Sequence, residues 1–328
     1  MLRMASSRSS QMGLPAVAAL WAVVVLLAAF WGIHAGFTGR RFAIALGVAA
    51  ALFALEFFLA VPRVLATVQR FLAGHPAVLA ALVPLFAVLL YSLSVAGNWK
   101  TMLAGAAYAV APALLVASVA GKMRGACGDY GAAILIWLPV QFRWMYRVFP
   151  YPPPLTHTLT VLMALSTGVA AFVLIRRLEG VGYAVEWKPD FAWNFAFHFV
   201  VFAAVAIPVG MKIGFLRWAP TLARARYLPL EALGILLFTA WPEEFLFRGV
   251  LQNLLSKTFK NEWAGLTIAS VIFGLSHIFH APYPNWKYVL LATIAGIFYG
   301  RAWMKTRSLV PGVLIHFLVD FSWHILFK

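Results

Sequence analysis

Long apolar runs alternate with short polar stretches along this chain. A helix of about 20 apolar residues spans the hydrocarbon core of a bilayer, so each run predicts a transmembrane helix. The expected spans are 14–33, 43–61, 77–96, 101–120, 158–175, 195–210, 228–255, 263–279, 288–304 and 309–327. The stretch 130–141 is short for a span, and we expect it to lie at the interface or to complete a helix broken by Pro139. The pattern predicts an all-α fold, a polytopic integral membrane helix bundle with about 8–10 transmembrane helices.

The composition supports the same fold class. Hydrophobic residues make up 63% of the chain and charged residues 11%, whereas soluble domains carry about 25% charged residues. The first run, 14–33, is longer than the apolar part of a cleavable signal peptide, so we expect a retained transmembrane helix. We therefore expect an integral membrane protein of the cell (inner or plasma) membrane. Basic residues occur in nearly every loop, so they favour a cytoplasmic N-terminus only weakly.

The formal net charge is +16, which in a soluble protein would suggest nucleic acid. Here the basic residues form short pairs beside apolar runs: Arg40–Arg41, Arg176–Arg177, and Arg224 with Arg226. Such pairs are typical of anchors drawn to anionic lipid headgroups. We expect the lipid bilayer as the partner of these residues, and no nucleic acid.

Polar residues inside the apolar runs are unevenly distributed. The first two-thirds of the chain has His34, Glu56 and His198, each alone, and we interpret them as packing contacts. The last hundred residues have three polar patches within apolar sequence. We therefore divide the chain into residues 1–227, transmembrane helices of unassigned role, and residues 228–328, a candidate catalytic core.

The first patch contains two adjacent glutamates. Glu244 and Arg248 are four residues apart and share one helix face, with the acid on the N-terminal side as such pairs prefer. Glu243 points about 100° away and has no helical partner. Pro242 removes a backbone hydrogen bond just before the acids, so a kink is expected there. The spacing predicts that Glu244 is held rigid by Arg248 and that Glu243 has a different task.

The second and third patches supply imidazoles. His277 lies one turn after Phe273, and a histidine in this setting can share a proton with a carboxylate. His316 and Asp320 are four residues apart, so Asp320 is expected to accept from one ring nitrogen of His316 and to fix its tautomer. Together the three patches could activate water by general base catalysis and stabilise an oxyanion. The alternative is that they are buried ionic contacts between helices, which explains one pair better than all six residues.

These patches resemble the CAAX protease and bacteriocin-processing family, which includes the Ras-converting endoprotease and the Abi proteins. The family pattern is Glu-Glu-x-x-x-Arg, then Phe-x-x-x-His, then His-x-x-x-Asn or Asp. It corresponds here to Glu243-Glu244 with Arg248, to Phe273 with His277, and to His316 with Asp320. Phe247-Arg248-Gly249 and Ser308-Leu309-Val310-Pro311 also agree with the family. The resemblance covers about residues 228–323, and nothing upstream matches beyond general hydrophobicity.

The resemblance implies a glutamic intramembrane protease. Glu243 and His277 would polarise the attacking water, and Glu244 with Arg248 would brace the site. His316 and Asp320 would support the oxyanion, and hydrolysis would need no covalent enzyme intermediate. Many relatives have Asn at the last position, whose amide can donate a hydrogen bond, whereas an ionised Asp only accepts. We therefore assign Asp320 to orienting His316.

A catalytic metal is the rival mechanism within the enzyme class. Glu243, His277 and His316 would make a zinc-like set of two histidines and one carboxylate. The single cysteine, Cys127, excludes a multi-cysteine zinc site and an intrachain disulfide. The resemblance favours the glutamic mechanism, so we expect no cofactor.

The resulting function is an intramembrane endopeptidase acting on a membrane-bound or lipid-anchored peptide or protein. The alternative from another class is a non-catalytic membrane protein that retains the fold, with a bacteriocin-resistance (immunity) or scaffold role. A transporter with a buried proton relay is disfavoured, because its broken helices would be paired in two related halves. The substrate, its prenylation and the oligomeric state are not indicated by the sequence.

Overall fold

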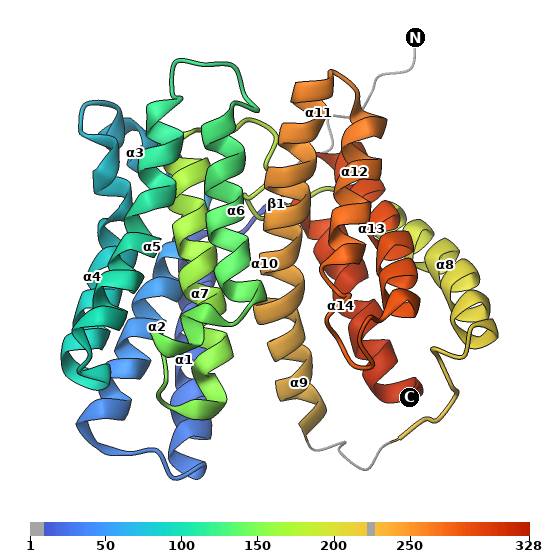
Figure 1. Cartoon of the computed structure of the whole chain (residues 1–328), viewed down its shortest axis with the longest axis horizontal. Coiled ribbons are helices and arrows are strands. Elements are labelled where there is room, and N and C mark those ends of the chain that lie inside the picture. The colour runs from blue at the N-terminus through green and yellow to red at the C-terminus, as the bar shows by residue number, and fades with distance from the viewer. Residues whose placement is uncertain (1–9, 222–226) are drawn as a thin grey trace. The chain divides into compact units, whose positions relative to one another are not determined.

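The computed structural model describes residues 10–221 and 227–328, which are almost entirely helical. The chain forms two compact units, Met12–Leu178 and Glu179–Lys328, and the strand Ser10–Gln11 belongs to the second (Figure 1). The prediction of an all-α polytopic membrane bundle is confirmed. The compact units divide near residue 178, while the predicted division at 227/228 was drawn on function and stays a prediction.

The first unit consists of seven main helices and several shorter segments among the described residues. They are α1 (Leu14–His34), α2 (Gly39–Leu59), α3 (Pro62–Ala73), η1 (Ala77–Ala81), α4 (Leu82–Tyr91), η2 (Ser92–Ala96), α5 (Trp99–Ser118), α6 (Cys127–Gln141), η3 (Trp144–Arg147), η4 (Pro153–Leu155), α7 (Thr156–Gly168) and η5 (Val169–Ile175). The centre of this unit is α7, in which every residue from Leu159 to Gly168 is buried. It packs against α2, α5 and α6.

Two segments of this unit refine the sequence interpretation. The stretch expected as 130–141 is a 15-residue helix, α6, with Pro139 inside it. The helix α3 was not anticipated, and none of its residues is buried. Its apolar and polar side chains separate onto opposite faces, which is the pattern of a helix that lies along a surface rather than within a core.

One of the expected headgroup anchors is wrong. Arg176 is fully buried and forms an ion pair with Asp129, with Nε of Arg176 at 2.6 Å from Oδ1. Asp129, which lies 47 residues earlier in the sequence, therefore makes Arg176 an internal contact rather than a headgroup anchor. Arg41 is partly engaged as well, since it donates to the Val95 carbonyl at 3.0 Å. Arg224 and Arg226 lie outside the described residues.

Glu56 and His198, which the sequence showed as isolated polar residues, each have a hydrogen-bond partner within their own compact unit. Ser166 donates to Oε1 of Glu56 at 3.0 Å inside the first unit. Nδ1 of His198 hydrogen-bonds the Asn194 carbonyl at 2.7 Å within its own helix. These contacts agree with the interpretation of Glu56 and His198 as packing residues.

The second unit holds all three polar patches. Its elements are β1 (Ser10–Gln11), β2 (Glu186–Trp187), α8 (Pro189–Lys212), α9 (Leu228–Ile235), η7 (Leu236–Ala240), α10 (Trp241–Glu244), η8 (Phe245–Gln252), α11 (Asn253–Phe259), α12 (Glu262–Leu275), α13 (Trp286–Thr306) and α14 (Leu309–Leu326). The five segments from α9 to α11 follow one another without a gap, and η7 and η8 are π-helical. The strands β1 and β2 pair antiparallel. Around the long helix, α12 packs on α13, and α8 packs on both α13 and α14.

Among the described residues, seven helices are long and apolar enough to cross a membrane: Leu14–His34, Gly39–Leu59, Ala77–Ala96, Trp99–Ser118, Pro153–Ile175, Pro189–Lys212 and Leu309–Leu326. The remaining predicted spans, 228–255, 263–279 and 288–304, are also largely helical. These less apolar helices carry most of the polar patches.

Polar caps and glycines determine how the helices of the second unit begin and pack. The side chains of Asn261, Asn285 and Ser308 accept backbone N–H bonds at the starts of α12, α13 and α14, which stabilises each helix start by about 1 kcal/mol. A Cβ on Gly296 of α13 would lie 3.0 Å from the Cα of Ser270 on α12. Because Gly296 has no side chain, α12 and α13 can approach each other closely at this point.

Candidate active site

The first patch lies where the long helix changes its winding. Glu243 and Glu244 end α10, and the π-helical segment η8 begins at Phe245 and contains Arg248. Wider π-helical turns inside α-helices are frequent at functional sites. The helix remains continuous, so the expected kink at Pro242 takes the form of altered winding rather than a break.

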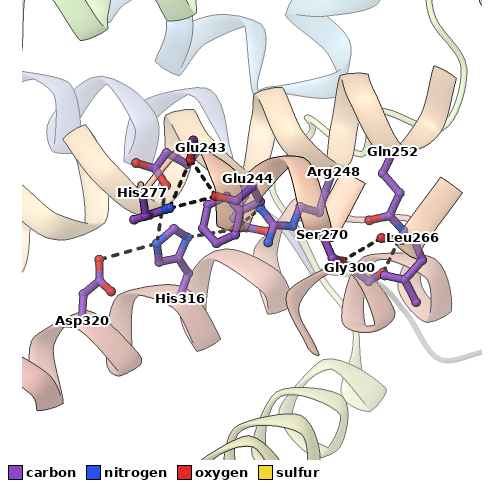
Figure 2. Close-up of polar contacts among 12 residues, drawn as sticks. Glu243, Glu244, Arg248, Gln252, Leu266, Ser270, His277, Gly300, His316 and Asp320 are labelled. Atoms are coloured by element: carbon purple, nitrogen blue, oxygen red, sulfur yellow. Dashed lines mark hydrogen bonds and ion pairs between the residues drawn. The ribbon is translucent and has the colours of Figure 1, made fainter. Parts of the chain in front are cut away.

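Glu244 is at the centre of a buried network. Its Oε1 lies 3.2 Å from Nη1 of Arg248 and accepts a hydrogen bond from Nδ1 of His316 at 2.9 Å (Figure 2). All three residues are buried. The expected Glu244–Arg248 pair is thus present, and it is joined to the third patch through the imidazole. Gly312 on α14 allows this approach, because a Cβ there would lie 3.1 Å from Oε2 of Glu244.

Glu243 is held less tightly than its neighbour. Its Oε2 lies 3.8 Å from Nε2 of His316, which is too long for a hydrogen bond. That oxygen is buried and makes no hydrogen bond within the described part of the chain. The Glu243 side chain as a whole is 34% exposed. A carboxylate in this state can accept a proton from a small molecule beside it.

Asp320 is near His316 but does not make the expected ring hydrogen bond. Its Oδ2 lies 3.5 Å from Nε2 of His316, whereas Glu244 binds Nδ1 at 2.9 Å. The tautomer of the ring is therefore defined by Glu244, a residue from another helix. The sequence predicted Asp320 as the hydrogen-bond partner of His316 because spacing along the chain identifies only partners on the same helix.

His277 ends the second patch just beyond α12. Its Nδ1 hydrogen-bonds the Phe273 carbonyl at 2.8 Å, and Oγ of Ser276 lies 3.1 Å from the same nitrogen. A carbonyl only accepts, so Nδ1 carries the hydrogen and Nε2 of the neutral ring is left as an acceptor. The rings of His277 and His316 both pack against Phe273, at centroid distances of 4.9 and 5.8 Å.

Aromatic residues that the motifs did not single out support the site. Tyr299 stacks on His316 with centroids 4.7 Å apart. The Arg248 guanidinium lies 4.3 Å from the Phe273 ring centroid and 5.1 Å from that of Tyr299. Rings at these distances stabilise a desolvated cation by about 2 kcal/mol. Tyr299 directly precedes Gly300 on α13, and no spaced motif marked it in the sequence.

A cavity opens beside the imidazoles. It encloses about 770 Å³ of empty space, part of it open to the exterior. His277, His316 and Asp320 line one part of it, while most of its wall is apolar and aromatic. The wall includes Phe199 and Phe202 of α8, a helix that the sequence did not connect with the motifs. The arrangement joins a polar end, suited to chemistry, to an apolar space suited to a hydrophobic group.

The potential metal ligands of the protein are its His, Cys, Asp and Glu side chains. Within residues 10–221 and 227–328, no group of three or more His, Cys, Asp or Glu side chains is arranged to hold a metal ion. Cys127 is free and exposed.

A polytopic helix bundle that buries a glutamate, an arginine and a histidine together is an integral membrane protein with an intramembrane polar site. Residues 225–322 match the family model for the type II CAAX prenyl endopeptidase Rce1-like proteins. This segment contains all three motifs, so the resemblance to the CAAX protease family is confirmed over these residues, and the chain carries an Rce1-like segment. No curated protein and no solved structure matches the chain.

Proposed function

We propose that this protein is an intramembrane endopeptidase of the glutamic type. It hydrolyses a peptide bond in a membrane-associated or lipid-anchored peptide or protein, without a metal or another cofactor. The Rce1-like segment supports CAAX-type peptidase chemistry in general. The assignment of Glu243, Glu244, Arg248, His277, His316 and Asp320 to this chemistry is part of the proposal.

The observation that carries the proposal is the contrast between the adjacent glutamates. Oε1 of Glu244 is tied to Arg248 at 3.2 Å and to His316 at 2.9 Å, whereas Oε2 of Glu243 approaches Nε2 of His316 only to 3.8 Å, too long for a hydrogen bond. A braced carboxylate holds its neighbours in place, and a free one can take a proton from water. This division suits a general base beside a supporting ion pair.

His277 would share the work of Glu243. With Nδ1–H given to the Phe273 carbonyl, Nε2 can accept a hydrogen bond from the attacking water. The water oxygen bonds to the substrate carbonyl carbon, and its proton passes to Glu243. That proton then goes to the amide nitrogen as the carbon–nitrogen bond breaks, so no covalent enzyme intermediate forms.

His316 would stabilise the oxyanion of the tetrahedral intermediate. Its Nδ1–H is given to Glu244, so its Nε2 carries a hydrogen only in the imidazolium form, and that form can donate to an oxyanion. Asp320, 3.5 Å from Nε2, would help to position the ring. This retains the expected orienting role for Asp320 but makes Glu244 the stronger partner.

The substrate would meet the site within the bilayer. The apolar wall of the cavity suits a hydrophobic side chain or lipid group attached to the peptide. We place the protein in the cell (inner or plasma) membrane, with the bilayer and a membrane-bound substrate as its partners and no nucleic acid. The Rce1-like family supports this only in outline.

The test compares membrane peptides in cells that express the wild type or Glu243→Gln. We expect cleavage products to disappear, since loss of a general base lowers the rate by about 100- to 10,000-fold. Glu231→Gln is the matched control on the same long helix, because Glu231 pairs with His324 away from the six site residues. An identical peptide profile for wild type and Glu243→Gln, with both proteins folded, would favour the non-catalytic immunity or scaffold role.

A further inference from the structure

A line of polar side chains continues from the candidate site along the same helix. Glu244, Arg248, Gln252 and Ser256 follow at every fourth position from α10 through η8 into α11. Residues four apart lie close to one another on a helix surface, and Figure 2 shows Arg248 between Glu244 and Gln252. These four residues are called the polar row.

Every member of the polar row has a buried polar atom without a hydrogen-bond partner in the described structure. These atoms are Oε2 of Glu244, Nη2 of Arg248, Oε1 of Gln252 and Oγ of Ser256. Nearly all buried polar atoms in native proteins are bonded, and those without a protein partner bind internal water. A single buried polar atom without a protein partner is common in native structures. Four such residues in succession on one helix face indicate that water molecules bind along that face.

The helices that face the polar row present bare backbone to it. A Cβ on Gly300 of α13 would lie 2.4 Å from Oε1 of Gln252, and one on Gly265 of α12 would lie 2.1 Å from Oγ of Ser256. Nε2 of Gln252 donates to the Gly300 carbonyl at 3.2 Å. The glycines therefore bring the backbones of α12 and α13, rather than apolar side chains, close against the row.

The two ends of the polar row differ in their surroundings. Glu244 lies in the candidate site, while Ser256 is only partly buried and stands one turn before the exposed Lys260 in the turn between α11 and α12. Charged residues at a helix end mark the water-facing side of a membrane protein. From 244 to 256 the helix rises about 18 Å, a little over half of the hydrocarbon thickness.

We propose that the polar row is a water-binding path that leads from the α11–α12 turn to Glu244 and supplies the candidate site. Each peptide bond hydrolysed consumes one water, whose hydroxyl goes to the carbonyl carbon and whose remaining hydrogen goes to the amide nitrogen. An apolar bilayer does not provide that water. The supply role rests on the proposed function, but the binding of water along the row does not.

Water entry is tested with single cysteines in a Cys127→Ala background. The variants are Gln252→Cys and Ser256→Cys, and the control is Leu254→Cys, since Leu254 and Gln252 are both fully buried on the same helix. Intact protein in lipid vesicles is exposed to aqueous Ag⁺, and the remaining free thiols are counted with a maleimide after denaturation. We expect thiol loss at 252 and 256 and protection at 254. Protection at all three positions overturns the proposal.

Supply to the site is tested by turnover of the peptide found in the comparison above. Gln252→Leu should lower kcat and leave KM unchanged, and Gln252→Glu should restore kcat, because a polar side chain again holds water. Thiol loss at 252 together with an unchanged kcat in Gln252→Leu overturns the supply role. If Glu243→Gln leaves cleavage intact while the thiols still react, the proposed function fails and water binding along the row stands.

Discussion

Each compact unit buries an arginine beside a carboxylate, and the surroundings of the two pairs differ. In the first unit, Arg176 bonds both oxygens of Asp129 and also three backbone carbonyls. Asp129 in turn accepts from the backbone N–H groups of Gly125 and Ala126. In the second unit, Nη1 of Arg248 lies 3.2 Å from Oε1 of Glu244, but Nη2 of Arg248 and Oε2 of Glu244 have no hydrogen-bond partner in the described structure.

The difference separates a structural contact from a candidate site. A buried pair whose hydrogen bonds are all made holds two segments together and offers nothing to a ligand. A buried cluster with open hydrogen-bonding positions is costly unless a ligand or water uses them. The number of unfilled positions, rather than the presence of charge, is thus the feature that distinguishes the candidate site in the second unit from the structural pair in the first.

The strongest test replaces each pair by apolar residues. Asp129→Leu with Arg176→Leu should keep cleavage activity, because an apolar pair of similar volume is often neutral for stability. Glu244→Leu with Arg248→Met should abolish cleavage, a loss of about 100-fold or more, since His316 loses its partner. Cleavage of the membrane peptide and thermal unfolding are measured for both variants. Equal activity in the two double variants would remove the distinction between the pairs.

Breaking one partner of the structural pair should affect stability. Asp129→Ala leaves Arg176 charged and buried, and we expect a loss of about 3–5 kcal/mol in the free energy of unfolding. Glu243→Gln should change the same quantity by less than about 1 kcal/mol, because Glu243 lacks a close partner. Both are measured by denaturant unfolding in detergent. A larger loss for Glu243→Gln than for Asp129→Ala would reverse the comparison.

A smaller effect is expected where Gly312 meets Glu244. Gly312→Ala puts a Cβ about 3.1 Å from Oε2 of Glu244, which should cost about 1–3 kcal/mol by overpacking and lower activity with it. Gly234→Ala on α9 is the control, because its Cβ meets no atom within 4 Å. Steady-state cleavage rates of the two variants are compared. The steric account fails if both alanines behave alike.

Two substitutions of Asp320 distinguish a need for its negative charge from a need for a polar side chain at this position. Asp320→Asn should keep most of the activity, because Glu244 provides the short ring hydrogen bond of His316. Asp320→Leu removes the polar neighbour of Nε2 and should lower the rate by about 10-fold or more. The rates are measured on the same peptide. Equal, severe losses in Asn and Leu would show that the negative charge itself is required.

No effect is expected from metal removal. Exhaustive chelation followed by assay in metal-free buffer should leave the cleavage rate unchanged, as a glutamic mechanism needs no ion. Loss of activity that returns when zinc is added back would favour the zinc-like set of Glu243, His277 and His316. The wild type treated without chelator is the control.

Much of this molecule was predictable from apolar runs and spaced motifs. The expected spans correspond to helices because a bilayer-length apolar segment has few alternatives to helix. The pair of Glu244 and Arg248 was predictable because both residues lie on one helix. The Glu244–His316 hydrogen bond and the Asp129–Arg176 pair were not, since each joins helices separated in sequence, by 72 and 47 residues.

Two further features of the structure, the winding of η8 and the helix α3, were difficult to predict from the sequence. The π-helical winding of η8 leaves no mark that a search for a 3.6-residue period would detect. The surface helix α3 is short and half polar, so it did not stand out as a span. The roles of the six site residues stay predictions, because proximity alone does not establish chemistry.

The cavity wall has a consequence for how such proteins diversify. Phe199 and Phe202 of α8 line the apolar space, yet α8 lies before the Rce1-like segment that carries the six candidate site residues. Substitutions in α8 can therefore alter which hydrophobic group fits while leaving the glutamates and histidines untouched. Substrate selectivity and catalytic chemistry would then evolve independently, so relatives with the same three motifs need not cleave the same substrate.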